Sequence, residues 1–344
     1  MAPTVRQIAE AARVSPATVS LALNNKPGVS QVTRQRILAI SETLRKKGTA
    51  DSFGAHAKGS IRFLKIVKHS HIVNRDHDVF IAAYAEGMDR EARRYGYSLE
   101  MTHITNKQIG DFIGHLNNSP TKGLIVLGTE LDAQDIIAFE NVNVPVVVID
   151  TTFDFIGLDF VDMNNMEALY QIVRFFLENN HREISLIWGE DVAARNFELR
   201  RVAFEQALRF YGLPFSSRNV ISVDSTFAGA YEGMLAHLKR GLKLPTALVS
   251  ANDLIASACM KAFKESGIRV PEDVSIIGFD NLPMCEMLDP PLTTMNVSKH
   301  QIGETAAQLL INRIRQGKDS STRKVSIGGR LIVRKSVWTL PIAP

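Results

Sequence analysis

Residues 5–30 read VRQIAEAARVSPATVSLALNNKPGVS, and this stretch decides the fold of the first part of the chain. Apolar residues recur with helical spacing from Val5 to Ala12, which predicts a short helix with one buried face. After a tight connection, Ser15 can cap a second helix, and Pro16 suits its first position because no N–H donor is needed there. The buried side of the second helix is expected to hold Val19, Ala22 and Leu23.

A third helix completes this unit. Ser30 can cap it, Ile37 and Ile40 are expected on its buried side, and the Arg-Lys-Lys run before Gly48 suits a helix C-terminus. Three short helices with a turn between the first two are typical of a helix-turn-helix head, whose second helix lies in the major groove of DNA. We therefore expect a DNA-binding domain over residues 1–47.

The positive charge of the chain is concentrated in the same region. Residues 1–60 hold nine Lys or Arg and three Asp or Glu, a net charge of +6, whereas the remainder holds 31 basic and 33 acidic residues, a net charge of −2. A solvated basic surface would give the same count. Together with the helix pattern, however, the uneven distribution favours contact of the head with a polyanion.

Several residues of the head are candidates for contacts with operator DNA. None of those expected to face the bases can make a bidentate hydrogen bond, so thymine methyl contacts and DNA shape should carry much of the specificity. Donors to phosphates would come from Thr4, Arg6, Ser15, Thr18, Ser20, Asn24, Lys26 and Ser30, and base edges would be contacted by Pro16, Ala17 and Leu21.

The head resembles that of the lactose repressor (LacI/GalR) family, densely from Val5 through the Lys-Pro-Gly-Val-Ser run that ends at Ser30. The family usually continues with Gly-Tyr-x-Pro-Asn and a hinge helix whose leucine enters the minor groove. This chain instead reads GTADSFGAHAK over residues 48–58, with Lys58 about where the leucine is expected. Residues 48–60 are therefore predicted to be a linker, in which either Phe53 replaces the leucine or no side chain enters the groove.

From Ile61 onward, apolar strand-like runs alternate with helical patterns. Strands are expected at residues 63–67, 99–104, 123–128 and 144–150, and the alternation then repeats through residues 184–188, 220–223, 246–250 and 274–279. This pattern predicts an α/β fold with doubly wound parallel sheets. The length is too great for one open sheet, so we expect two subdomains with a cleft between them, one of residues 61–163 plus 295–323 and the other of residues 164–294 plus 324–344.

Other classes of protein lack their signatures in this sequence. It contains no GxGxxG after a strand, no GxxxxGK[ST], no GxSxG and no HExxH, so we expect neither an enzyme nor a bound cofactor. Its two cysteines, Cys259 and Cys285, form neither a CxxC pair nor a disulfide framework. The first residues lack the apolar stretch of a signal peptide and no run is long enough to span a membrane, so we expect a cytoplasmic protein without a membrane partner.

A dense run of histidine and aspartate lies at the start of the expected core. His69-Ser70-His71 is followed by Asp76-His77-Asp78, and imidazole and carboxylate groups are common metal ligands. A loop of this composition is more often the solvated edge of a cleft, and we assign no metal site to it.

The resemblance to the LacI/GalR family continues through the core. It is carried by VPVVVID at residues 144–150, PEDVSIIGFDN at 271–281, PPLTT at 290–294 and LIVRKS at 331–336. It implies a sensor core like a periplasmic binding protein, with an effector site between two subdomains. Matched position by position, the residues that it implies for effector binding are Phe80, Arg200, Phe227, Asn252 and Asp280.

The resemblance implies a homodimeric repressor whose operator affinity is switched by a small polar effector. A sugar is favoured, and a purine or a carboxylated metabolite also suits these residues. Structural roles remain open for two of them, since Asp280 could cap a turn and Arg200 could pair with Glu198. A secreted solute-binding protein would share the fold, but it would need a signal peptide and no basic head. An enzyme on the same scaffold is the other alternative.

Overall fold

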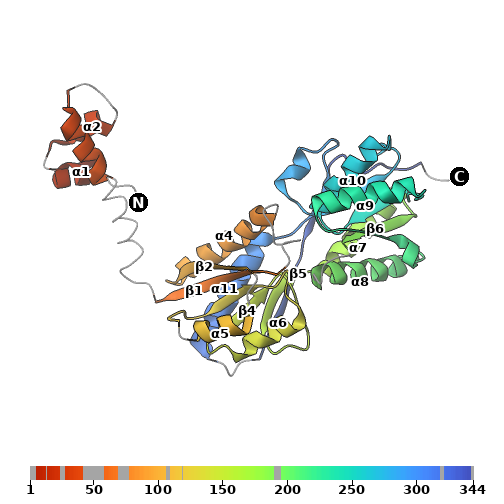
Figure 1. Ribbon diagram of the computed structural model, residues 1–344, viewed down its shortest axis with the longest axis horizontal. Helices are drawn as coiled ribbons and strands as arrows, with labels where there is room; N and C mark the ends of the chain where they lie inside the picture. Colours follow the sequence, from red (N-terminus) through yellow and green to blue (C-terminus); the bar gives the residue numbers. More distant parts are fainter. Residues whose placement is uncertain are drawn as a thin grey trace. The chain divides into compact units, whose positions relative to one another are not determined.

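The computed structural model describes residues 5–12, 14–23, 28–41, 58–68, 77–105, 109–117, 119–189, 195–317 and 321–341 (Figure 1). The chain divides into two compact units. One comprises residues 1–59 with 96–98, and the other comprises residues 60–95 with 99–344. The second unit contains both sheets of the protein and is called the core below.

The head contains the three predicted helices. They are α1 (Val5–Ala12), α2 (Pro16–Leu23) and a helical segment at residues 31–41. The Oγ atom of Ser15 accepts a hydrogen bond from the N–H of Thr18 (3.1 Å), and that of Ser30 accepts one from Thr33 (3.2 Å), so both predicted caps are confirmed. The core of the head consists of Ile8, Ala9, Ala12, Val19, Ala22 and Ile37, with Val14, Val29 and Ile40 packed against it.

Two details of the head depart from, or add to, the sequence pattern. Leu23 was expected on the buried side of α2, but its side chain is 39% exposed because the helix ends there. Gly28 has a φ of 108°, a left-handed conformation that only glycine adopts without strain, at the turn before the third helix. Phe53, which the sequence leaves as one alternative for the minor-groove residue, lies outside the described residues.

The first sheet of the core has six strands in the order β11-β5-β4-β3-β1-β2. The pairs β1 with β3, β3 with β4, β4 with β5 and β5 with β11 are all parallel. Its strands are β1 (Ser60–Val67), β2 (Ser98–Thr105), β3 (Leu124–Leu127), β4 (Val146–Ile149), β5 (Asp159–Met163) and β11 (Lys324–Ile327). Its helices are α4 (Asp78–Arg94), α5 (Ile109–Leu116), α6 (Ala133–Ala138), the short helix η2 (Phe139–Asn141) and α11 (Lys299–Gln316).

The second sheet also has six strands, in the order β12-β10-β9-β8-β6-β7, with an antiparallel pair only between β10 and β12 among the described pairings. Its strands are β6 (Ile184–Gly189), β7 (Val220–Val223), β8 (Ala247–Ser250), β9 (Ser275–Asp280), β10 (Thr293–Asn296) and β12 (Arg330–Ile332). Its helices are α7 (Asn165–Glu178), α8 (Arg195–Phe210), η3 (Ser217–Asn219), α9 (Phe227–Lys239), α10 (Asp253–Glu265) and η4 (Pro283–Glu286).

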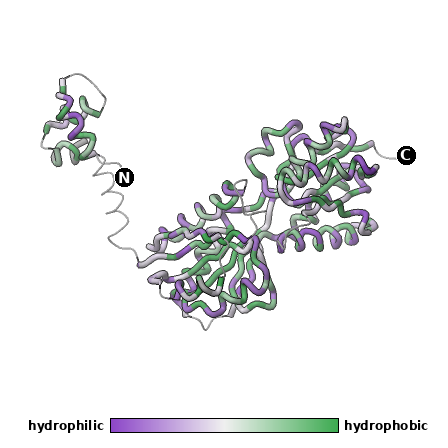
Figure 2. Tube along the Cα trace, in the orientation of Figure 1, coloured by the Kyte–Doolittle hydropathy of each residue, from purple (hydrophilic) through white to green (hydrophobic). Residues whose placement is uncertain are grey.

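Helices cover both faces of each sheet, as the alternating pattern predicts. Helices α4 and α11 pack against each other beside the first sheet, while α7 with α8 and α9 with α10 form pairs beside the second (Figure 1). Colouring by hydropathy shows apolar strands inside and mixed polar and apolar helices outside (Figure 2). The fold class is therefore confirmed: two doubly wound, mainly parallel α/β sheets follow a helix-turn-helix head.

The chain passes between the two sheets three times. The passages lie between Met163 and Asn165, between Asn296 and Lys299, and between Ile327 and Arg330. The sequence pattern predicts the second and third passages after residues 294 and 323, which is earlier in the chain than the structure has them. The third is wrong because β11 pairs in parallel with β5, so residues 324–327 belong to the first sheet rather than to the second.

Helices α4 and α11 cross at two glycines. A Cβ atom on Gly87 would overlap the carbonyl oxygen of His300, and one on Gly303 would overlap the carbonyl oxygen of Tyr84. Only glycine therefore permits the backbones to approach this closely. The crossing fixes the position of the N-terminal turns of both helices, which contribute residues to the site described below. Among the helices that the structure describes, none is long and apolar enough to cross a membrane.

Candidate functional site

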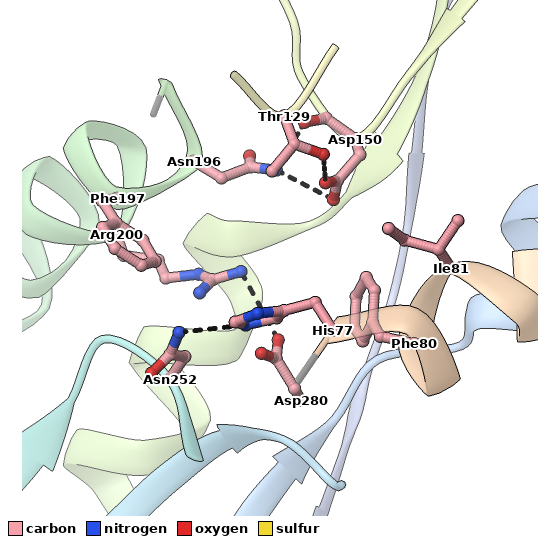
Figure 3. A pocket seen from close by; sticks show the side chains of 10 residues that line it. All are labelled: His77, Phe80, Ile81, Thr129, Asp150, Asn196, Phe197, Arg200, Asn252 and Asp280. Atoms are coloured by element: carbon pink, nitrogen blue, oxygen red, sulfur yellow. Dashed lines mark hydrogen bonds and ion pairs between the residues drawn. The ribbon is translucent and has the colours of Figure 1, made fainter. Parts of the chain in front are cut away.

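A cavity lies in the core where the carboxyl ends of the strands of both sheets meet (Figure 3). Open parallel sheets place ligand sites at this edge because strand-end loops converge there. The cavity has a volume of about 440 Å³, which includes its opening to solvent. Its lining residues are His77, Phe80, Ile81, Thr129, Asp150, Asn196, Phe197, Arg200, Asn252 and Asp280.

Two of these residues have unusual backbone conformations. Asp150 directly follows β4 with a φ of 59°, and Asp280 ends β9 with a φ of 112°. Residues other than glycine rarely adopt positive φ, and such strain persists only where the surrounding structure enforces it. Here it turns both carboxylates from the strand ends into the cavity (Figure 3).

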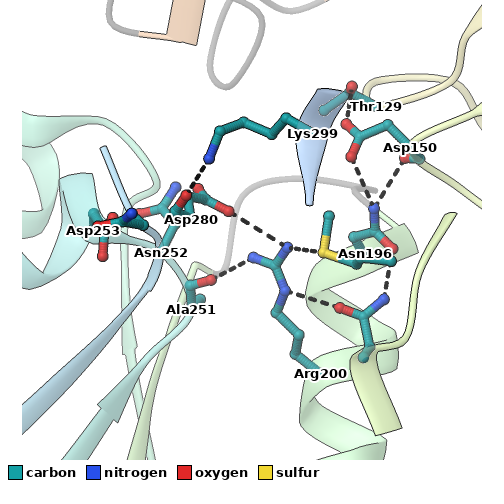
Figure 4. Close-up of polar contacts among 12 residues, drawn as sticks. Thr129, Asp150, Asn196, Arg200, Ala251, Asn252, Asp253, Asp280 and Lys299 are labelled. Carbon is teal, nitrogen blue, oxygen red and sulfur yellow. Dashed lines mark hydrogen bonds and ion pairs between the residues drawn. The ribbon is translucent and has the colours of Figure 1, made fainter. Parts of the chain in front are cut away.

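Arg200 reaches the cavity from α8 and is 4% exposed. Its Nε donates to Oδ1 of Asn165 (3.0 Å), its Nη1 to the carbonyl oxygen of Ala251 (2.5 Å), and its Nη2 lies 2.9 Å from Sδ of Met163 (Figure 4). The guanidinium carbon is 3.8 Å from the centre of the Phe279 ring. The alternative that Arg200 pairs with Glu198 is wrong, because the described partner of Glu198 is Arg201.

Asp280 stands beside this arginine. One of its carboxylate oxygens is 3.8 Å from Nη2 of Arg200, an ion pair without a close hydrogen bond. Burial raises the pKa of Asp280 to about 7, against the lowering effect of the Arg200 charge. The carboxyl group therefore exchanges its proton near neutral pH and can accept hydrogen bonds from a ligand that displaces that proton.

A second polar network connects the two subdomains (Figure 4). Nδ2 of Asn196 donates to the carbonyl oxygen (3.0 Å) and Oδ1 (3.3 Å) of Asp150, and it also lies 3.2 Å from Oδ1 of Asp162. Nδ2 of Asn165 donates to Oδ1 of Asn196 (2.9 Å), and the same Asn165 accepts from Arg200. Hydrogen bonds thus run from the end of β4 in the first sheet to Arg200 on α8.

Asp150 and Asp162 are both buried within this network. Oδ1 of Asp150 accepts from the hydroxyl of Tyr84 (2.9 Å), and Oδ2 accepts from Thr129. Burial raises the pKa of Asp150, and burial together with the neighbouring charge of Asp150 raises that of Asp162 to about 7. Oδ2 of Asp162 has no hydrogen-bond partner among the described residues.

The loop that carries Asp280 is held by Asp253 and Lys299. Asp253 accepts from the N–H of Leu282 (2.8 Å) and from the hydroxyl of Thr294 (2.6 Å), and burial raises its pKa. Nζ of Lys299 donates to the carbonyl oxygen of Asp280 (2.5 Å) and lies 5.0 Å from the centre of the Phe80 ring, although burial lowers its pKa. Lys299 therefore connects the two subdomains at the edge of the cavity.

Four of the five residues predicted for effector binding line this cavity, namely Phe80, Arg200, Asn252 and Asp280. Phe227 does not line it and instead begins α9 as a half-buried residue. Asn252 has a second role, because its Oδ1 caps α10 by accepting from the N–H of Ile255 (2.8 Å). Sequence reasoning did not assign His77, Ile81, Thr129, Asp150, Asn196 and Phe197 to the site.

The sequence held a signal for two of the residues that were missed. Asp150 follows the all-apolar strand β4 directly, as Asp280 follows β9, and Asn196 stands one helical turn before Arg200. His77 belongs to the histidine and aspartate run that was considered as a metal site. His69, His71 and Asp76 lie outside the described residues, and within the described residues no group of three potential ligands could hold a metal ion.

Part of the predicted DNA-contacting set is described. Ser15, Pro16, Ser20 and Ser30 are exposed, and Thr18 and Leu21 are half exposed, so a polar side of α2 is open to solvent. Thr4, Asn24 and Lys26 lie outside the described residues, and nothing is described of the side chains of Arg6 and Ala17. The hydroxyl groups of Ser15 and Thr18 form a hydrogen bond (2.8 Å between the two oxygens) at the N-terminus of α2. In heads of this kind, that end of the helix lies nearest the bases.

Both parts of the chain match known protein families. Residues 4–45 match the family described as bacterial regulatory proteins, lacI family, and residues 173–337 match the periplasmic binding protein-like domain. The HTH-type transcriptional repressor CytR of Escherichia coli (strain K12) is 31% identical over 99% of this chain and 98% of its own length. The HTH-type transcriptional repressor PurR of Aliivibrio fischeri is 29% identical over 97% of this chain and 98% of its own length.

Solved structures share the fold over almost the whole chain. A complex of the transcriptional regulator CelR with cellobiose has a TM-score of 0.71 at 23% identity, covering 97% of this chain and 99% of its own. The lac repressor dimer bound to operator and the anti-inducer ONPF has a TM-score of 0.69 at 23% identity, covering 98% of this chain and 100% of its own. The chain therefore belongs to the lacI family of bacterial regulatory proteins and is a DNA-binding transcriptional repressor with an effector-binding core.

Proposed function

We propose that this repressor binds its operator as a homodimer and that a small polar effector in the cavity of the core sets its operator affinity. One observation carries the proposal: the cavity is lined from both subdomains, by Phe80 and Asp150 on one side and by Arg200, Asn252 and Asp280 on the other. A ligand held by both sets makes different contacts in each relative orientation of the subdomains. Such differential contacts are what a ligand needs to shift an equilibrium.

The polar network supplies a physical route for this coupling. Asn196 holds Asp150 and Asp162 of the first subdomain, and Asn165 links Asn196 to Arg200. An effector that accepts hydrogen bonds from Arg200 competes with Asn165 for the same guanidinium group. Binding would therefore loosen or reorganise hydrogen bonds at the first passage between the sheets and favour another subdomain orientation.

The head would contact DNA through the exposed side of α2. Phosphates would be bound by the polar residues assigned above, from Thr4 to Ser30, and bases would be contacted by Pro16, Ala17 and Leu21. A dimer would bind two half-sites of a near-palindromic operator. The lac repressor, which has a similar fold, has been solved as a dimer bound to its operator, and this supports the same arrangement here. We place the protein in the cytoplasm, with its operator, and propose no enzymatic activity or cofactor for it.

The head is tested by comparing the full chain with a chain lacking residues 1–60. Operator affinity, measured by fluorescence anisotropy, should be lost in the shortened chain, while the core keeps its thermal unfolding transition. In the full chain the logarithm of affinity should fall linearly with the logarithm of salt concentration, because phosphate contacts release counterions. Operator binding by the shortened chain, or a flat salt dependence, would contradict this assignment.

The cavity is tested through Asp280. Native mass spectrometry of the purified chain identifies any ligand that accompanies it, and calorimetry with that ligand then compares Asp280→Ala with Asp289→Ala, whose side chain is 91% exposed. Loss of the cavity carboxylate should weaken ligand binding by about 1–3 kcal/mol and leave ligand-free operator affinity near the wild-type value. Equal ligand affinity in both variants would place the effector elsewhere.

A further inference from the structure

The carboxylate of Asp280 is the strongest acceptor that the cavity offers to a ligand. It is 5% exposed, it lines the cavity, and among the described residues no N–H or O–H donates to its oxygens. Its one described ion-pair partner is Arg200, at 3.8 Å. A ligand group that donates hydrogen bonds would therefore find an acceptor at Asp280 that the protein itself leaves unused.

Arg200 offers a ligand much less. Each of its three nitrogens already has a protein partner, in Asn165, Ala251 and Met163, and its plane lies against Phe279. A ligand carboxylate or phosphate would have to break these contacts before it could bind the guanidinium. The geometry therefore disfavours an anionic effector.

The charges around the cavity point the same way. Four buried aspartates, Asp150, Asp162, Asp253 and Asp280, face two cations, Arg200 and Lys299, so the fully ionised group would carry a net charge of −2. Arg195, on the same helix as Arg200, lies over the ring of Phe153 and does not line the cavity. Buried charges need compensation, and burial raises the pKa of Asp162 and of Asp280, which favours the protonated form of each carboxyl group.

A nitrogen base of the protein itself lines the cavity. The imidazole of His77, which is 5% exposed, lines the cavity together with Asn252, Asp280 and Arg200 (Figure 3). Its Nε2 is 3.5 Å from Nδ2 of Asn252. His77 precedes α4 in the first subdomain, whereas those three neighbours belong to the second. The ring therefore reaches across the cleft into the space that a ligand would need.

We propose that the effector carries a protonated nitrogen, as in an amino sugar or a basic heterocycle, and that this group binds Asp280 in the part of the cavity that the His77 ring also lines. The inference rests on the cavity being the effector site proposed above. Binding displaces His77 from between the two subdomains, and the ligand cation replaces both the ring and the proton of Asp280. The cleft thereby recognises charge in addition to hydroxyl groups.

The test uses ring-shaped probes of equal size in the full chain with His77→Ala. Imidazole is largely protonated at about pH 6, as a histidine side chain is, whereas pyrazole is a far weaker base and stays neutral. The binding of each probe is measured by thermal shift and calorimetry. His77→Ser, which places a favoured N-cap residue before α4, serves as a second variant if the first unfolds.

We expect imidazole to bind the His77→Ala chain at least about tenfold more tightly than pyrazole at about pH 6, and this ratio to fall towards one at about pH 8. Adding Asp280→Asn should also bring the ratio close to one, whereas adding Asp289→Asn, an exposed control, should leave it unchanged. Equal binding of the two rings, tighter binding of pyrazole, or binding of neither ring would overturn the inference.

These outcomes are distinct from failure of the proposed function. A neutral ligand that releases or recruits the operator through the cavity would contradict the charge preference and leave effector control in place. If variants at Asp280 and Arg200 leave the response of operator binding to ligand unchanged, effector control through this cavity is itself wrong. Operator anisotropy and probe binding are therefore measured on the same variants.

Discussion

Asp162→Asn should stabilise the core, and the gain over the wild type should grow as the pH rises from mildly acidic to alkaline values. Asp162 is 2% exposed, its Oδ1 accepts from the N–H of Met163 (2.8 Å) and from Asn196, and its Oδ2 has no described partner. An asparagine can keep Oδ1 as the acceptor and place its amide nitrogen where Oδ2 stands. The change therefore removes the buried negative charge and keeps the shape of the side chain.

The magnitude follows from the pKa. Burial and Asp150 raise the pKa of Asp162 from 3.8 to about 7 in the folded chain, so the folded state binds this proton more tightly than the unfolded state does. The free energy of unfolding consequently falls as the pH rises through the window between the two values, and it is constant above about pH 7. The full difference is up to about 4 kcal/mol, at about 1.4 kcal/mol for each pKa unit.

Urea unfolding of wild type and Asp162→Asn at several pH values between about 5 and 8 measures the effect. The variant should exceed the wild type by about 2 kcal/mol at about pH 5 and by about 4 kcal/mol at about pH 8. Asp289→Asn is the control, because its side chain is 91% exposed and should give a difference independent of pH. If the difference between Asp162→Asn and wild type does not grow with pH, Asp162 is not a buried group with a raised pKa.

Two further predictions concern packing and a buried ion pair. Gly87→Ala should destabilise the core by about 2 kcal/mol or more in urea unfolding, because the added methyl group meets the backbone of α11. The control is Gly114→Ala, whose methyl group meets nothing within 4 Å and which should be neutral or stabilise α5. Similar losses of stability in both variants would refute the close crossing of α4 and α11. Asp159→Ala should lower the free energy of unfolding by about 3–5 kcal/mol, because it leaves Arg313 buried without the carboxylate that its Nε (2.6 Å) and Nη2 (2.7 Å) contact. The double variant Asp159→Leu with Arg313→Met should recover most of that loss. If the effects of the two changes simply add, the two residues act separately.

Local signals predicted the elements of the fold well. Ser15 and Ser30 marked the starts of helices because capping depends on a few neighbouring residues. The alternation of apolar runs and helical patterns indicated parallel sheets without further information. The allocation of strands to the two sheets was less accessible. Strands β11 and β12 are separated by Gly328 and Gly329 without a helix between them, and nothing in their own residues says that one joins β5 and the other β10.

The candidate site shows the same division between local and distant information. Asp280, Asn252 and Arg200 could be predicted because each stands in a recognisable motif at a strand end or on a helix. The bridge from Asp150 through Asn196 to Asn165 could not, because it depends on side chains from β4, α8 and α7 meeting in space. Phe227 illustrates the reverse case, since a motif suggested a ligand contact and the path of the chain places the ring away from the cavity.

The position of α11 in the sequence has a consequence for synthesis of the protein. This helix packs against strands of the first sheet and against α4, and its residues Ile302, Gly303 and Ala306 are buried. The first five strands of that sheet are complete at Met163, but α11 ends at Gln316, about 150 residues later. At translation rates of about 5–20 residues per second, the nascent first subdomain keeps an apolar face uncovered for roughly 8–30 s, while the whole second subdomain emerges from the ribosome. Folding chaperones would find their binding surface there during that interval, and chains that terminate before residue 299 would never cover it.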